Sequence, residues 1–313
     1  MPHAPLIPGS SAWPADGSRS VVTIGNFDGV HLGHRSLLSR TVQLASKRDV
    51  IPTAFTFDPA PRDVLRPNNP IARIQTLDDR VRELVRHGAT RVVVEPFDLA
   101  YAAHDAEWFA TEVLQRRLRA AAVVVGWDFR FGKARGGSVE TLRNVLNVPV
   151  YQVDPFQLNE KTISSSRIRT LLAEGHVAAA AELLDRPHQV CGTVVHGDAR
   201  GRTLGFPTAN VRPQTELVPK AGVYAVRMDT PTATGVAGVA NVGVRPTFGP
   251  SAQSVEVHLL DFDGDLYDAQ VRVHFTQRLR DEQRFASVDG LVAQVTADVA
   301  QARALLAGAG PTP

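Results

Sequence analysis

The chain has 313 residues, 43% hydrophobic and 21% charged, a composition that fits a folded globular protein and excludes extended disorder. Its formal charge is only +2 and its basic residues are scattered, which excludes the concentrated basic footprint of a nucleic-acid binder. Cys191 is the single cysteine, and neither a secretion signal nor an apolar run of ~18 residues is present. We therefore expect a cytoplasmic protein without nucleic-acid or membrane partners, and the sequence is compatible with a homo-oligomer.

Residues 21–184 alternate short β-branched runs with amphipathic stretches. The pattern predicts strands at 21–27, 51–57, 92–95 and 123–125, and helices at 33–47, 77–87 and 107–118. Such alternation is typical of a parallel sheet with crossover helices, so we expect a Rossmann-like α/β fold. Residues 1–18 and 308–313 are expected to be loosely ordered.

The pattern changes after Gln189, where short strand-like segments follow one another with Gly, Pro and Asp turns between them. We predict strands at 190–195, 222–227, 236–242, 254–260 and 270–275, and a helix at 288–306. These elements indicate an all-β antiparallel barrel with one C-terminal helix. The length suits two domains, and we place their boundary near Arg186-Pro187-His188, giving domains 1–187 and 188–313.

The segment IGNFDGVHLGH (24–34) joins the first predicted strand to the first predicted helix. Ligands of open α/β sheets bind at the carboxyl ends of strands, where a helix N-terminus offers unpaired N–H groups to phosphate. His31 and His34 share a helix face, and Gly33 leaves room for close approach of a phosphate. Two imidazoles there suit direct displacement at the α-phosphorus of a nucleotide. A helix cap is the alternative, while a zinc site would need a third ligand that no local motif supplies.

A second candidate phosphate site is the segment ISSSRIR (163–169), which precedes a short predicted helix ending at Gly175. Serine hydroxyls, helix N–H groups and Arg169 one turn on can hold a polyphosphate, although a plain serine cap explains the serines alone. The segment GWDFRFGKA (126–134) is not a Walker loop, because five residues separate its glycines and Ala134 replaces the required Ser or Thr. We interpret it as a strand end with a ligand-lining loop.

These three motifs together resemble the adenylyltransferase module of bacterial bifunctional riboflavin kinase/FAD synthetases. The resemblance implies a nucleotidylyltransferase fold and the transfer of AMP from ATP to FMN. It implies that His31 and His34 are catalytic. It also implies a set of nucleotide contacts at Gly25, Asn26, Phe27, Asp28, Gly33, Asp128, Ser164, Ser165, Ser166 and Arg169.

The segment GTVVHGDARGRTLGFPTAN (192–210) is rich in glycine and basic residues and leads into an extended segment. Its backbone N–H groups could wrap a phosphate, although a plain hairpin loop is the alternative; the glycines concerned are Gly197, Gly201 and Gly205. Thr208 and Asn210 are two residues apart, so on a strand both project to one side and could present oxygen atoms to Mg²⁺.

Glu256 lies in an alternating strand (SVEVHL, 254–259), on the face opposite the valines. By itself it is more often a solvated surface residue. If it faces Thr208 and Asn210, its carboxylate could accept the proton of an attacking hydroxyl. Periodicity alone does not decide between these two interpretations.

The C-terminal half is similar to the riboflavin kinase module through GRTLGFPTAN, the G-V-Y at 222–224, NVGVRPTFG at 241–249 and VEVHLLDF at 255–262. The resemblance implies Thr208 and Asn210 around Mg-ATP and Glu256 as the base for the ribityl hydroxyl. It places the nucleotide at Gly197, Gly201, Arg202 and Gly205. The segment RDEQRF (280–285) resembles the part of the family near the flavin, implying contacts from Arg280, Glu282, Arg284 and Phe285.

Both modules occur in the family's order, so we expect a magnesium-dependent transferase that makes FMN from riboflavin and ATP, and then FAD from FMN and ATP. Two other functions stay open: a nucleotidylyltransferase acting on another phosphorylated substrate, and a flavin or nucleotide sensor that has lost turnover. In each case the expected partners are small molecules.

Overall fold

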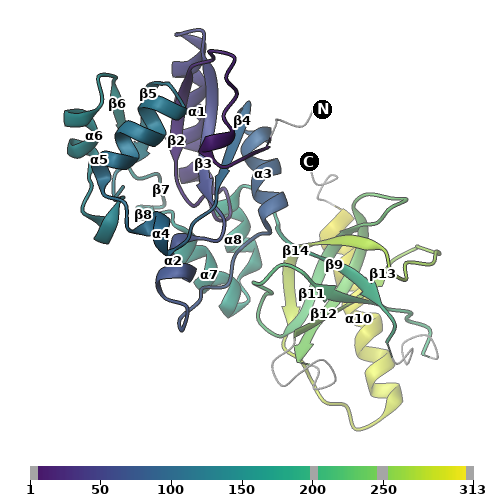
Figure 1. Cartoon of the computed structure of the whole chain (residues 1–313). Helices are drawn as coiled ribbons and strands as arrows, with labels where there is room; N and C mark the ends of the chain where they lie inside the picture. Colours follow the sequence, from purple (N-terminus) through teal and green to yellow (C-terminus); the bar gives the residue numbers. More distant parts are fainter. Residues whose placement is uncertain (1–5, 198–203, 245–252, 308–313) are drawn as a thin grey trace. The chain divides into compact units, whose positions relative to one another are not determined.

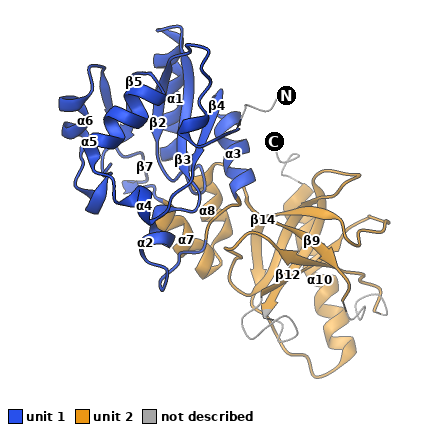
Figure 2. Ribbon diagram, viewed as in Figure 1, with its two compact units in different colours: residues 1–72, 77–164 blue, residues 73–76, 165–313 orange. Residues whose placement is uncertain are grey.

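The computed structural model describes residues 6–197, 204–244 and 253–307. Their contacts divide the chain into two compact units, one formed by residues 1–72 and 77–164 and the other by residues 73–76 and 165–313 (Figure 2). Among the helices of this described part, none has both the length and the apolar character needed to cross a bilayer.

The first unit contains a six-stranded sheet in the order β1-β4-β3-β2-β5-β6 (Figure 1), and every neighbouring pair in it is parallel. Its strands are β1 (Leu6–Pro8), β2 (Ser20–Ile24), β3 (Ile51–Phe57), β4 (Arg91–Glu95), β5 (Ala120–Gly126) and β6 (Val150–Val153). The predicted Rossmann-like α/β fold is confirmed. From β2 the chain first adds β3 and β4 on one side and then crosses to β5 on the other, so β2 is the topological switch point.

Apolar side chains alternate along the strands and fill two cores, one on each face of the sheet. Val21 of β2 faces the core that α1 (Leu32–Ser46) and α3 (Leu77–Arg86) cover, while the next residue, Val22, faces the core beneath η2 (Phe109–Arg117) and α6 (Val139–Val145). The remaining elements are short: η1 (Ser10–Ala12), α2 (Pro61–Leu65), α4 (Leu99–Ala102), α5 (Ala106–Trp108), η3 (Lys133–Arg135), β7 (Gln157–Leu158) and β8 (Lys161–Thr162).

The expectation of loose order at the start of the chain is wrong for residues 6–18. Strand β1 pairs in parallel with β4, with Ile7 opposite Val93 and buried against it. A strand of three residues is too short for its sequence to show a period, so the sequence pattern does not predict β1. Residues 308–313 lie outside the described part of the chain.

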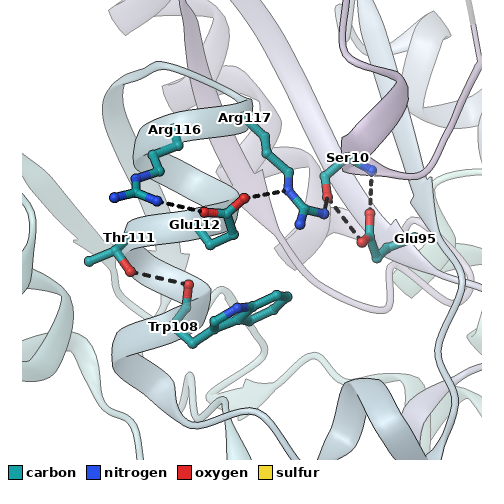
Figure 3. A network of polar contacts seen from close by, with 7 residues as sticks. All are labelled: Ser10, Glu95, Trp108, Thr111, Glu112, Arg116 and Arg117. Carbon is teal, nitrogen blue, oxygen red and sulfur yellow. Dashed lines mark hydrogen bonds and ion pairs between the residues drawn. The ribbon is translucent and has the colours of Figure 1, made fainter.

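A polar network follows β1 and ties it to the end of β4 (Figure 3). The backbone N–H and the hydroxyl of Ser10 both donate to the carboxylate of Glu95, the hydroxyl at 3.0 Å. Arg117 donates to the same hydroxyl at 3.2 Å and to Glu112 at 3.1 Å. Burial raises the pKa of Glu95, while the two bonds from Ser10 and the charge of Arg117 oppose that rise.

The second unit contains a closed antiparallel barrel in the order β10-β13-β12-β11-β14-β9, with β9 pairing to β10. Its strands are β9 (His188–Val195), β10 (Ala209–Pro213), β11 (Gly222–Asp229), β12 (Val236–Val244), β13 (Gln253–Leu259) and β14 (Gln270–Arg280). Helix α10 (Val288–Ala307) packs on the outer face of β11 and β12 (Figure 1). The predicted barrel with one C-terminal helix is confirmed.

Two helices that precede the barrel in sequence belong to its compact unit: α7 (Ser165–Glu174) and α8 (Val177–Leu184) (Figure 2). Helix α8 packs against β9 and β14. Gly175, which joins the two helices in a left-handed conformation, is so close to Arg278 that a Cβ would lie 2.7 Å from its Nε. The predicted boundary at 187/188 concerns the extent of the two activities and stays a prediction.

Candidate functional site

The two histidines lie at the start of α1, directly after the switch-point strand β2. His31 is the N-cap residue, and its Nδ1 accepts a hydrogen bond from the backbone N–H of His34 at 3.4 Å. The two rings stack with their centroids 3.7 Å apart and their planes 16° from parallel, and the ring of Phe27 makes a T-shaped contact with that of His34. The helix cap that the sequence left as an alternative is therefore present, and it uses the nitrogen of His31 that faces the helix.

Glycine at position 33 makes this arrangement possible. A Cβ there would lie 3.2 Å from both Cε1 and Nδ1 of His31, closer than most real contacts of that kind. The same Cβ would lie 3.8 Å from the carbonyl oxygen of Ile163, so Ile163 borders the start of α1. Ser164, the first serine of the second motif, is the next residue in the chain. Close approach of a phosphate to Gly33 stays a prediction.

Arg80 of α3 is a residue that the sequence reasoning missed. Its side chain is 4% exposed, and it donates to the carbonyl of Asn26 at 3.0 Å and to that of Phe57 at 3.2 Å, with Asp58 as an ion-pair partner at 3.5 Å. It therefore fixes the segments that follow β2 and β3 against each other. The available signal was its position three residues after Leu77 and four before Leu84, on the apolar stripe of the helix.

The other residues predicted for nucleotide binding lie in several places. Gly25, Asn26, Phe27 and Asp28 form the segment between β2 and α1, where Phe27 has a left-handed φ of 49° and Asp28 is buried. Asp128 is exposed and borders a cavity of about 440 Å³ together with Trp127, Phe129, Arg130, Arg135, Ser138, Val139, Glu140, Arg143 and Gln152. Ser165, Ser166 and Arg169 lie in the first turns of α7, in the second unit.

In the barrel, the strand register places Glu256 beside Asn210, a proximity that the sequence pattern alone could not establish. Strand β13 lies between β10 and β12, and its Glu256 is directly opposite Asn210 on one side and Asn241 on the other. Side chains at paired positions project to the same face of a sheet. Because the flanking residues Val255 and Val257 are buried inside the barrel, this polar row lies on its outer face.

One cavity of about 440 Å³ lies between that outer face and α10. Its polar lining includes Thr208, Asn241, Glu256, His258 and Glu282. Its apolar lining comes from the loop before β10, from the barrel strands, from the segment after β14 and from the first half of α10: Leu204, Phe206, Val223, Val239, Phe285, Leu291, Val292 and Val295. The cavity thus has a polar end and an apolar wall, as a flat aromatic ligand with a polar tail requires.

A second cavity, of about 680 Å³, shares Thr208 with the first. It is lined by the end of β9, the start of β10 with the two residues before it, the end of β13 and the segment that follows: Val194, Pro207, Thr208, Ala209, Val257, Leu259, Phe262, Asp263, Gly264, Asp265, Leu266 and Tyr267. The Tyr267 ring stacks on His196 with centroids 3.9 Å apart. Thr208 therefore borders both cavities, whereas Glu256 lines the first one.

The glycine-rich loop is described only at its two ends. Gly197 lies against the amide of Asn210, since a Cβ would fall 2.6 Å from its Cγ. Gly205 has a left-handed φ of 84°, which favours glycine. Gly201 and Arg202, also predicted to bind the nucleotide, lie outside the described residues.

The residues predicted to contact flavin divide into three groups. Glu282 and Phe285 line the first cavity, and Glu282 accepts a hydrogen bond from Asn241 at 3.2 Å. Arg280 also borders it, but all three of its guanidinium nitrogens bond to the protein, two of them to Asp298. Arg284 is exposed and is not among the residues that line the cavity.

Comparisons with known proteins cover most of the chain. A family model described as FAD synthetase matches residues 14–167, and one described as riboflavin kinase matches residues 184–306. The Escherichia coli K12 protein named bifunctional riboflavin kinase/FMN adenylyltransferase is 40% identical over 286 residues, 90% of this chain and 91% of its own. A Pseudomonas fluorescens protein of the same name is 40% identical over 291 residues, 92% and 93% of the two chains. A crystal structure described as a macrolide-efflux protein from Streptococcus pneumoniae matches with a TM-score of 0.88 and 33% identity, covering 96% of this chain and 98% of that one.

Proposed function

Because the chain belongs to the bifunctional riboflavin kinase/FMN adenylyltransferase family, we propose here which of its residues carry the two reactions. The C-terminal module phosphorylates riboflavin with ATP to give FMN and ADP. The N-terminal module transfers AMP from ATP to FMN to give FAD and pyrophosphate. The substrates are therefore ATP, riboflavin and FMN.

For the kinase reaction, we assign riboflavin to the cavity beneath α10 and ATP to the neighbouring cavity. The observation that carries this assignment is the position of Thr208 on the border of both cavities, two residues before Asn210, which is paired with Glu256. The ribityl hydroxyl gives its proton to Glu256 as its oxygen bonds to the γ-phosphorus, and the bond to the β-phosphate oxygen breaks to release ADP.

Mg²⁺ fits the oxygen donors beside this point. Thr208 supplies a hydroxyl and Asn210 an amide oxygen, and one or two protein oxygens with substrate phosphates and waters are enough for this ion. When bound, Mg²⁺ neutralises charge on the transferring phosphate. The backbone of Gly197 lies against the side-chain amide of Asn210 and keeps that amide in place. We assign phosphate contacts to the loop residues Gly201, Arg202 and Gly205.

For the adenylyl transfer, we assign the α-phosphate of ATP to the start of α1. A phosphate oxygen of FMN attacks the α-phosphorus, pyrophosphate leaves, and no covalent enzyme intermediate forms. His31 and His34 donate to the oxygens on which charge grows, and the first N–H groups of the 15-residue helix add to that field. The remaining proposed nucleotide contacts are Gly25, Asn26, Phe27, Asp28, Gly33, Asp128, Ser164, Ser165, Ser166 and Arg169.

We further propose that residues 1–187 carry the FMN adenylyltransferase and residues 188–313 the riboflavin kinase, and that the enzyme works in the cytoplasm on small molecules alone. The stacking of the histidine pair directly after a switch-point strand, with His31 buried, supports the first assignment. The polar row on the outer barrel face supports the second.

Separable loss of activity tests these assignments. The double variant His31→Ala with His34→Ala should lose FAD formation from supplied FMN by at least about 10²-fold and keep FMN formation. Glu256→Gln should lose FMN formation by about 10²-fold or more and keep FAD formation from supplied FMN. Both rates are followed by chromatographic separation of riboflavin, FMN and FAD. Loss of both activities in either folded variant would contradict the proposal of two independent sites, and flavin binding without turnover in the unmodified protein would favour a sensor.

A further inference from the structure

Helix α10 has two halves with different surroundings. Its second half packs on the barrel through Val299, Ala302 and Leu306, and its end is held where Arg227 donates to the carbonyl of Leu306 at 2.7 Å. Its first half instead faces the cavity beneath it, with Leu291, Val292 and Val295 as lining residues. The helix is therefore firmly packed at one end and forms a cavity wall at the other.

Asp298 lies where these two halves meet. Its side chain is 3% exposed, and it accepts three hydrogen bonds from Arg280: from Nε to each carboxylate oxygen at 3.0 Å and from Nη2 at 2.7 Å. Gln294 adds a fourth at 3.0 Å. Leaving a buried carboxylate unpaired is costly, so this pair strongly favours one rotation of α10 about its axis and one position along that axis relative to the barrel.

Arg280 connects the helix to two further parts of the cavity. Its Nη1 donates to the carbonyl of Asp281 at 2.9 Å, which fixes the segment that follows β14. Its guanidinium also lies over the ring of Phe285, 5.8 Å from the ring centroid, and Phe285 lines the cavity. One guanidinium thus sets the position of the helical wall and of the aromatic wall.

We propose that the Arg280–Asp298 pair is a positioning device for riboflavin phosphorylation, which holds α10 and Phe285 at the spacing that the flavin ring requires. This inference rests on the proposed location of riboflavin in the cavity beneath α10. Arg280 acts through the walls it fixes, since each of its three guanidinium nitrogens already donates to Asp298 or to a backbone carbonyl, and the double variant described below separates this role from direct contact with the flavin.

The test compares Asp298→Asn, Arg280→Lys and their combination in the whole chain. Lysine keeps the charge but loses the planar fork, and asparagine keeps the shape but loses the charge. Each single variant should raise the KM for riboflavin and weaken flavin binding, measured by fluorescence quenching, by about 10- to 100-fold. The KM for ATP and the rate of FAD formation from supplied FMN should change less than about twofold. The reason is that the substitutions weaken only the binding of riboflavin, equally in the ground state and the transition state.

A second ion pair on the same helix gives a matched control. Arg303 and Asp261 form an exposed bidentate pair, with one hydrogen bond of 2.7 Å, away from the cavity lining. Asp261→Asn should leave every one of these constants unchanged. A similar rise in the riboflavin KM in this variant would mean that any loosening of the helix has the same effect, and would overturn a specific role for the buried pair.

The combination separates positioning from direct contact. If the pair acts as a unit, the double variant should be no worse than the worse single variant. Additive losses, with Arg280→Lys far worse than Asp298→Asn, would mean that Arg280 contacts the flavin itself and would overturn the proposal. Val295→Trp checks the premise, because a filled cavity should abolish flavin binding. Normal binding in that variant would refute the location of riboflavin and with it the proposed function of the cavity.

Discussion

Replacing Gly33 with alanine should separate stability from activity in the first unit. Alanine is worth up to about 1 kcal/mol more than glycine inside a helix. Against this, its Cβ would fall 3.2 Å from the ring of His31, which is 5% exposed and stacked on His34. Weakening the cap that this ring provides costs about 1 kcal/mol. The two effects nearly cancel, so the free energy of unfolding should change by less than about 1 kcal/mol.

Adenylyl transfer should fall measurably on the same substitution, even though the stability stays nearly constant. The ring of His31 has to shift by a few tenths of an ångström, and displacement of a catalytic group by about 1 Å can cost 10²-fold in rate. We expect FAD formation from FMN and ATP to fall about 3- to 10-fold, with FMN formation unchanged. Chromatography of the flavins measures both rates, and urea unfolding measures the stability.

Ser39→Ala is the matched control, because Ser39 is exposed on the same helix and gains helix propensity without touching the histidines. It should form FAD at the rate of the unmodified protein. A Gly33→Ala protein that also forms FAD at that rate would refute the reasoning, since the position of the His31 ring would then be unimportant for adenylyl transfer.

Substitutions at His188, Arg80 and Gly197 test three other parts of the structure. Burial holds the pKa of His188 at about 4, below its ordinary 6.5, so the stability that its neutral ring contributes is present above pH 6.5 and falls by about 3 kcal/mol as the pH drops through 4. His188→Gln should remove that acid sensitivity in urea titrations, and an unchanged pH profile would contradict it. Arg80→Leu should lower FAD formation at least about 10-fold while sparing FMN formation, because the segments after β2 and β3 lose their shared donor; equal loss of both activities would indicate general unfolding instead. Gly197→Ala should displace the amide of Asn210 and lower FMN formation about 10-fold or more, and normal kinetics would show that this amide is not needed.

The sequence predicted the architecture well where patterns are long. Strand β3 and the alternation of β13 match their predicted ranges closely, because a run of five or more alternating or β-branched residues has few competing structures. The first strand was predicted too long: β2 ends at Ile24, since Gly25 begins a segment in which Phe27 takes a left-handed conformation. The edge strands β1 and β6 are too short to show a period.

The contacts between residues of the candidate sites were harder to predict from the sequence than the secondary structure. That Glu256 faces Asn210 follows from the register of β10 against β13, a non-local pairing that no single strand encodes. Arg80 and Asp298 were missed for a shared reason, because a charged residue within a helix is ordinarily solvated and only its position on the apolar stripe hinted otherwise. The polar motifs beside strand ends were found because each combines glycines with chemistry-bearing residues.

The placement of α7 and α8 with the barrel bears on how such a two-activity gene could be divided. A barrel expressed from residue 188 onward would leave the faces of β9 and β14 that α8 covers open to water, and would discard an apolar helix surface formed by Val177, Ala180, Leu183 and Leu184. Lineages that keep the kinase alone would need new polar residues on those strands, or a replacement for the helix. A division ahead of α7, at Ser165, would instead leave this packing intact, so the structural limit of the barrel unit lies more than twenty residues before its first strand.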